Sequence, residues 1–185
     1  MVSETHPFAS QLGAAFERLP APLRDFHMTT RSRIFSGRAS IEHGQGTFTK
    51  TVIALAGFPP AAQDVPLTIE ISKNERKEKW VRSFGRHKTR SAITVDGVTG
   101  KITEVFGPFS CTLKLEVKNA TLHIATPSAK FLGLPLPSAL SPQSRSVEFS
   151  DGPNRLCFDI KAFWPNNVVI IRYAGFLLVP SEDTL

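Results

Sequence analysis

Apolar residues at helical spacing predict two short helices in the N-terminal half of the chain. In the first 28 residues, four of them recur at steps of four, four and three, which is typical of an amphipathic helix: Phe8, Leu12, Phe16 and Leu19. A second helix is predicted over 47–56, with an apolar face of Phe48, Val52 and Leu55. Gly57 then supplies the left-handed residue of a helix stop, and two prolines follow soon after it.

Most of the remaining chain alternates apolar and polar residues with period two, which predicts β-strands. Candidate strands run over 31–42, 66–72, 78–84, 88–95, 101–106, 109–117, 120–127, 144–150, 154–163 and 168–178. Their short connections are rich in turn residues, which predicts antiparallel neighbours. The stretch 128–143 holds three prolines and is expected to form a looped excursion or lid.

This many strands cannot remain a flat sheet, because twist accumulates and open edges invite pairing with other chains. The predicted fold class is mainly β (α+β), with a curved antiparallel sheet or closed barrel of about ten strands. We expect the two short helices and the excursion to cover one opening. A length of 185 residues suits one domain, 1–185, whose first 28 residues are helical.

Composition narrows the class of protein. Hydrophobic residues make up 41% and charged residues 21% of the chain, which is typical of a globular protein. The chain opens without a signal-peptide pattern, and it has no apolar run of the roughly 20 residues that a membrane span needs. We therefore expect a soluble, cytoplasmic protein. Cys111 and Cys157 are too few for a disulfide framework and lack metal-ligand spacing.

The chain carries a net charge of +6, with basic residues gathered in KNERKEK (73–79) and GRHKTR (85–90). Such runs fit either a solvated turn or a contact with nucleic acid or an anionic surface. The solvated turn is the simpler interpretation, because the neighbouring aromatic residues are expected to face inward. Nucleic acid is therefore the least favoured partner.

Four strands are predicted to place polar residues in one lateral row. If Arg86 and His87 form the turn after strand 78–84, Arg82 lies opposite Ser91. Similar turns place Ser91 opposite Glu104, and Glu104 opposite Cys111. The same faces of these strands otherwise carry apolar residues such as Trp80, Phe84 and Phe106, so the row is expected to lie inside.

Two interpretations of this row remain open. Arg82 and Glu104 form a structural ion pair that fixes the sheet register, or the row orients the polar head of a mostly apolar ligand. A register error of one residue would instead turn the row outward.

Other residues have weaker sequence support for a chemical role. His27 is a possible general base at the mouth of a pocket, although a cap or packing role is the simpler reading. The only tyrosine, Tyr173, either donates to a ligand or holds a strand in place. His43 and His123 lack partners at ligand spacing, so no metal site is expected. The chain has no glycine-rich phosphate loop, and no cofactor is expected.

Seven short motifs resemble, in order, an uncharacterised bacterial family known as domain of unknown function 4166. They are LPAPLRDFH (19–27), GRASIEHGQG (37–46), ALAGFPPA (54–61), WVRSFGRHKTRS (80–91), TEVFGPF (103–109), LGLPLPSALSP (132–142) and IRYAGFLL (171–178). The resemblance implies a link to oxidoreductases similar to saccharopine dehydrogenase, but this chain lacks an attached dinucleotide-binding domain. The family's W-x-R-x-F and E-x-F-G patterns fall on Trp80, Arg82, Phe84, Glu104, Phe106 and Gly107, and its trailing serine falls on Ser91.

The leading hypothesis is a barrel that binds an apolar small molecule in its concavity. Arg82, Ser91 and Glu104 would orient the polar group, and the nearby aromatic residues would supply apolar contact. If the protein is an enzyme, Glu104 is the best acid or base. The alternatives are an accessory module that docks onto an oxidoreductase, and a nucleic-acid-binding protein that uses the basic rims.

Overall fold

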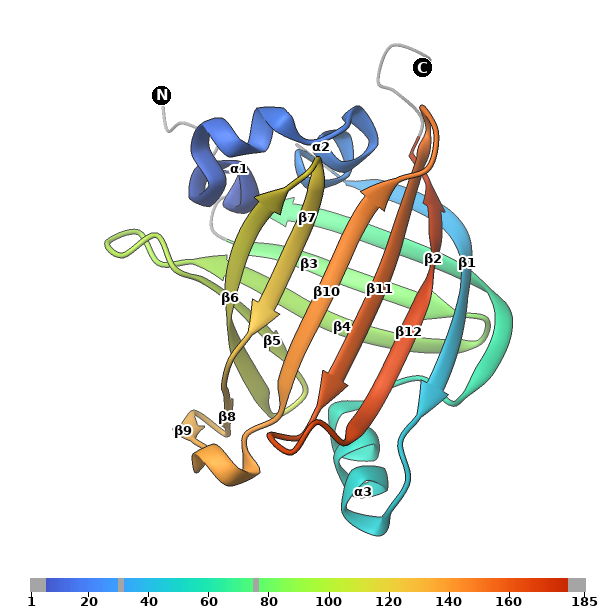
Figure 1. The fold of residues 1–185 in the computed structure, drawn as a ribbon, viewed down its shortest axis with the longest axis vertical. Coiled ribbons are helices and arrows are strands. Elements are labelled where there is room, and N and C mark those ends of the chain that lie inside the picture. Colours follow the sequence, from blue (N-terminus) through green and yellow to red (C-terminus); the bar gives the residue numbers. More distant parts are fainter. Residues whose placement is uncertain (1–5, 30–31, 75–76, 180–185) are drawn as a thin grey trace.

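Ten antiparallel strands close into a barrel in the computed structural model, which describes residues 6–29, 32–74 and 77–179 (Figure 1). Around the ring the order is β5-β4-β3-β2-β1-β12-β11-β10-β7-β6, and β6 pairs back with β5. The strands are β1 (Arg33–His43), β2 (Ala62–Asn74), β3 (Lys77–Phe84), β4 (His87–Val95), β5 (Ile102–Phe106), β6 (Phe109–Lys118), β7 (Thr121–Thr126), β10 (Gln143–Ser150), β11 (Arg155–Phe163) and β12 (Val169–Leu178). The predicted closed barrel is confirmed. The start of predicted strand 31–42, and positions 75 and 76 of the basic segment 73–79, lie outside the described residues.

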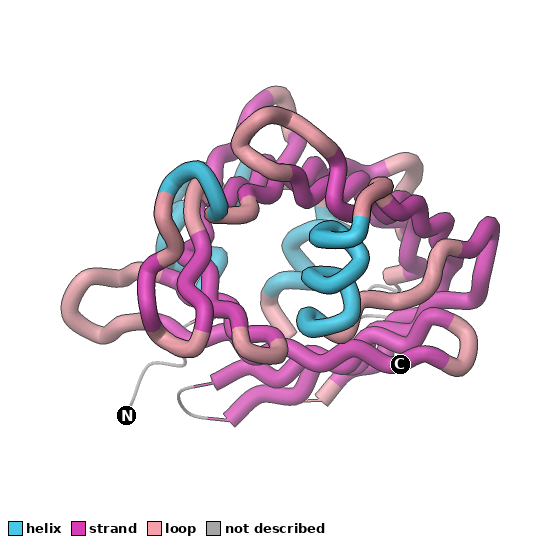
Figure 2. The backbone as a smooth tube through the Cα atoms, turned by 90° about the horizontal axis from the view of Figure 1, so that it is seen from below, coloured by secondary structure: helices cyan, strands magenta, loops and turns pink. Residues whose placement is uncertain are grey.

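The helices lie at opposite ends of the barrel, which differs from the expectation that they cover one opening. α1 (Pro7–Leu12), the 3-10 helix η1 (Gly13–Arg18) and α2 (Ala21–His27) cross one end, whereas α3 (Thr47–Ala56) lies at the other (Figures 1 and 2). The predicted first helix is also broken at Gly13. Its apolar stripe is nevertheless buried, because Phe8, Phe16 and Leu19 are at most 2% exposed.

The end of α3 follows the predicted stop. Gly57 adopts a left-handed conformation with φ of 67°, and its N–H donates to the Ala54 carbonyl. The N–H of Phe58 reaches back to the Ile53 carbonyl at 3.1 Å. These two bonds satisfy carbonyls that the end of a helix otherwise leaves free. Phe58 is thereby turned toward the barrel interior.

The stretch 128–143 holds β8 (Ala129–Phe131), β9 (Leu134–Pro135) and the 3-10 helix η2 (Ser138–Leu140). β8 pairs with the start of β6, so the excursion lies at the same end of the barrel as α3 (Figure 1). It exposes Leu132, Leu134 and Leu140, each to more than half of its surface.

The turn between β3 and β4 consists of Gly85 and Arg86, since Phe84 pairs with His87. Arg82 therefore lies opposite Thr89 rather than opposite Ser91 as predicted. Likewise, Glu104 lies opposite Ile93, two residues from the predicted partner, whereas its pairing with Cys111 is confirmed. The tight turn favours Gly85 at its first position because the backbone there has φ of 57°. An error of two residues leaves every side chain on its predicted face.

Close contact between β1 and β12 depends on Gly175. A Cβ atom there would lie only 2.0 Å from the Arg38 carbonyl oxygen. We expect Gly175→Ala to push the strands apart and to lower the unfolding free energy by about 1–3 kcal/mol. Urea denaturation measures this loss, and Gly97→Ala is the control because no heavy atom lies within 4 Å of the added group. Equal stability of the two variants would contradict the account.

No helix among the described residues is long and apolar enough to cross a membrane.

Candidate functional site

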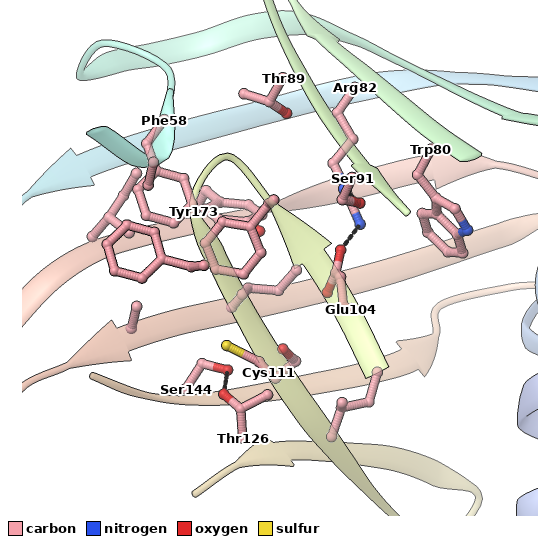
Figure 3. Close-up of a pocket in the computed structure, with 18 of the residues that line it drawn as sticks. Phe58, Trp80, Arg82, Thr89, Ser91, Glu104, Cys111, Thr126, Ser144 and Tyr173 are labelled. Carbon is pink, nitrogen blue, oxygen red and sulfur yellow. Dashed lines mark hydrogen bonds and ion pairs between the residues drawn. The ribbon is translucent and has the colours of Figure 1, made fainter. Parts of the chain in front are cut away.

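The barrel encloses a cavity of about 150 Å³ that its side chains leave unfilled (Figure 3). Its wall is mostly apolar, and it is built from the inward faces of β3–β7 and β10–β12. Residues of α2 border it at one end, and residues of the α3 end, including Phe58, border it at the other. A cavity of this size holds a benzene-sized guest in another protein.

A polar belt crosses this wall at Arg82. Its Nη1 donates to Ser91 Oγ at 2.7 Å, and its Nη2 donates to Glu104 Oε1 at 3.1 Å (Figure 3). The Arg82 and Glu104 side chains are 17% and 20% exposed, and all three residues line the cavity. The predicted inward row therefore exists, and the Ser91 contact is diagonal across the strands. Its partners make an inward guanidinium tolerable, because Glu104 compensates its charge and two of its N–H groups are hydrogen-bonded.

The apolar residues predicted for the site surround the belt. Trp80 lies against the guanidinium, with Arg82 Cζ 4.9 Å from its ring centre, which is a cation–π contact. The Phe84 ring meets the Tyr173 ring edge-on, with 5.8 Å between the ring centres, and the ring centres of Phe106 and Phe58 are 5.7 Å apart. All of these aromatic side chains line the same cavity.

The Tyr173 hydroxyl is a free polar group on this wall. It makes no hydrogen bond to another of the described residues, whereas the Tyr173 ring packs against Phe84 and Phe158. Burial is the main cause that raises the pKa of Tyr173, so this phenol stays protonated and can donate a hydrogen bond.

Below the belt, Thr126 and Ser144 join their hydroxyls in a hydrogen bond beside Cys111 (Figure 3). Neither hydroxyl was predicted from the sequence as a site residue. Burial, together with the charge of Glu104, raises the pKa of the Cys111 thiol to about 12. Cys111 is therefore a thiol at physiological pH and is unsuited to act as a nucleophile.

A second polar group closes the end of the cavity beneath α2. His27 Nε2 lies 2.6 Å from Glu148 Oε2, and the two side chains are only 1% and 9% exposed. The Phe8 ring stacks on the imidazole at 4.0 Å, and His27 Nδ1 is buried without a hydrogen-bond partner among the described residues. Predicted site residue His27 thus lines the cavity, but in a different place from Glu104.

Sequence reasoning missed Glu148. On β10 the inward positions are Ser144, Ser146 and Glu148, while Phe149 is 41% exposed on the outer face. A strand with polar residues inside reverses the usual pattern, so hydrophobicity alone assigns the wrong face. The Ser-x-Ser-x-Glu spacing was the available signal.

Glu78 lies near His27 and Trp80 and is 4% exposed. Burial raises the pKa of its carboxyl above the ordinary 4.5, although a hydrogen bond from Trp80 Nε1 and the charges of His27 and Lys73 act against this. Above pH 4.5 the native state therefore keeps a proton that the unfolded chain has lost. Deprotonation of buried Glu78 thus costs stability as pH rises through that window.

We expect Glu78→Gln to be more stable than the wild type at neutral pH and equally stable near about pH 4. Glutamine keeps an oxygen that accepts from Trp80 Nε1 but never ionises. Urea unfolding at both pH values measures the difference. A variant less stable than the wild type at neutral pH would show that the charges of His27 and Lys73 outweigh burial.

The described residues contain no group of three or more His, Cys, Asp or Glu side chains placed to hold a metal ion.

Fold and site together define a closed antiparallel barrel with an apolar cavity and an internal charged belt. Residues 19–177 match the family model described as Domain of unknown function (DUF4166), so the chain belongs to that family. A comparison with curated proteins finds no match. Among solved structures, the chain is similar to a protein with unknown function from the DUF3598 family of Nostoc punctiforme PCC 73102. That similarity has 11% identity and a TM-score of 0.41, and covers 80% of this chain and 46% of that chain.

Proposed function

We propose that this protein binds an apolar small molecule inside the barrel, with the polar group of the ligand at Arg82, Ser91 and Glu104. The observation that carries the proposal is the unfilled, mostly apolar cavity crossed by one charged belt. Ligand pockets combine an apolar wall with a few convergent polar groups in this way. A barrel that needed only stability would gain more from filling the same space with side chains.

The donors at the belt support this role. A guanidinium has five N–H donors, and the contacts to Ser91 and Glu104 use two of them. Further donors and the free Tyr173 hydroxyl are thus available to a guest. Trp80 holds the guanidinium plane in position, so a ligand would meet a largely preorganised group.

We place the entrance at the end that carries α3 and the 128–143 excursion. The cavity reaches residues from both segments there, whereas the aromatic side chains of α1 and α2 pack across the other end. Exposed Leu132 and Leu134 would offer an apolar ligand its first contact.

Native mass spectrometry and thermal shift with a lipid and metabolite library test the proposal. We expect a retained or added apolar compound to raise the melting temperature of the wild type. In Cys111→Phe, a ring would occupy the cavity without changing a charge, so we expect a folded protein that no longer responds. A response of equal size in that variant would locate binding outside the barrel.

Acid–base chemistry on the ligand by Glu104 or His27 stays a prediction. The specific observation in its favour is that both groups border the cavity, with His27 Nε2 polarised by Glu148. Such chemistry would need the reacting atom of the ligand to lie near the Glu104 carboxylate or the His27 imidazole.

The accessory-module hypothesis also stays a prediction, tested by co-purification with an oxidoreductase. Nucleic-acid binding through 73–90 is less favoured, because Trp80 and Phe84 are only 5% and 6% exposed and cannot stack on bases.

A further inference from the structure

We infer that the ligand carries a neutral polar head, a hydroxyl or carbonyl group, rather than a carboxylate or phosphate. The inference rests on the proposed binding function and adds the chemical class of the ligand. It follows from the balance of charge inside the cavity, where the only inward-facing guanidinium among the described residues is already paired.

Arg82 is the natural anchor for an anionic head, but Glu104 lies 3.1 Å from its Nη2. An entering carboxylate would have to share that guanidinium with Glu104. Two carboxylates on one cation in an apolar wall leave one negative charge uncompensated, which is costly away from bulk water. A neutral head avoids this cost, because it can accept from Arg82 while Glu104 stays paired.

The other charged groups of the cavity also favour a neutral head over an anionic one. Glu148 adds a second carboxylate, and its partner His27 can at most neutralise it. Arg90 also borders the cavity, but it is an exposed residue between the inward-facing Thr89 and Ser91. The interior charge is therefore zero or negative, and an anion gains no net attraction.

Hydroxyl groups make up much of the remaining polar lining. Thr89, Thr126, Ser144 and Tyr173 are spread around the belt (Figure 3). Each hydroxyl both donates and accepts, so together they suit a head that does the same. An anionic head can use only their donors.

A matched pair of probes tests the inference: 4-phenyl-1-butanol and 4-phenylbutyrate share one skeleton and differ in the head. Isothermal titration at pH 8 is expected to show the alcohol binding the wild type at least about tenfold more tightly than the acid. If the acid binds as tightly as the alcohol, binding stands and the neutral-head inference fails. If neither probe binds, the proposed function itself is contradicted.

Glu104→Gln provides the sharper outcome, because it frees the guanidinium without changing the shape of the wall. We expect the preference for the alcohol to disappear, with 4-phenylbutyrate binding about tenfold more tightly than to the wild type. The double variant Arg82→Gln/Glu104→Gln is the control, and it should not gain affinity for the acid, because it has no guanidinium to free. An unchanged preference in Glu104→Gln would overturn the inference. If that variant does not fold, the wild-type comparison still decides.

Discussion

Arg82→Met is expected to lower the unfolding free energy by about 3–5 kcal/mol and to abolish ligand binding. The substitution keeps an unbranched side chain but removes the charge that compensates Glu104 and the donor that satisfies Ser91. An unpaired carboxylate would then remain in a mostly apolar cavity. Urea denaturation and titration with 4-phenyl-1-butanol measure the two effects separately.

The double variant Arg82→Met/Glu104→Leu separates structure from function. It removes both charges, and replacing an enclosed pair by apolar residues often restores stability. We expect a variant close to the wild type in stability that still fails to bind. Restored binding in this variant would show that Arg82 and Glu104 only stabilise the register of the sheet. Unchanged stability in the single variant Arg82→Met would show that the Glu104 carboxylate does not depend on Arg82 for its charge compensation.

His27→Leu is expected to cost about 3–5 kcal/mol of unfolding free energy, because it leaves the buried Glu148 carboxylate without its partner beneath the N-terminal helices. Leucine keeps apolar contact with Phe8 but cannot pair with the carboxylate 2.6 Å from His27 Nε2. Glu78 would lose a favourable charge at the same time. Thermal and urea unfolding of the variant at pH 7 measure the loss.

The matched variant His27→Leu/Glu148→Leu should recover most of that stability. If it is as unstable as His27→Leu alone, the loss comes from packing against Phe8 rather than from the stranded charge. Full stability of the single variant would contradict the pairing.

Alternation along the strands was enough to predict the barrel and the inward position of Arg82 and Glu104. The prediction survived an incorrect register, because the two errors at β3–β4 and β4–β5 were each two residues long and kept every face. Gly85 supplied the local reason: it favours a turn one residue earlier than the one assumed.

The pair of His27 and Glu148 could not be predicted from the alternation of apolar and polar residues. Glu148 lies inside while Phe149 of the same strand lies outside, so β10 contradicts the rule that identified the belt. Its partner His27 comes from a helix 121 residues away in the chain, a contact that depends on how the helices pack across the barrel. The placement of α3 at the opposite end was missed for the same reason, because local spacing predicts a helix but not the opening that it covers.

A crystal structure with 4-(4-bromophenyl)-1-butanol tests the central claim most directly. The account predicts anomalous density for bromine inside the barrel, with the hydroxyl within hydrogen-bond distance of Arg82 or Tyr173. An interior filled by side chains, or bromine found only on the outer surface, would contradict it.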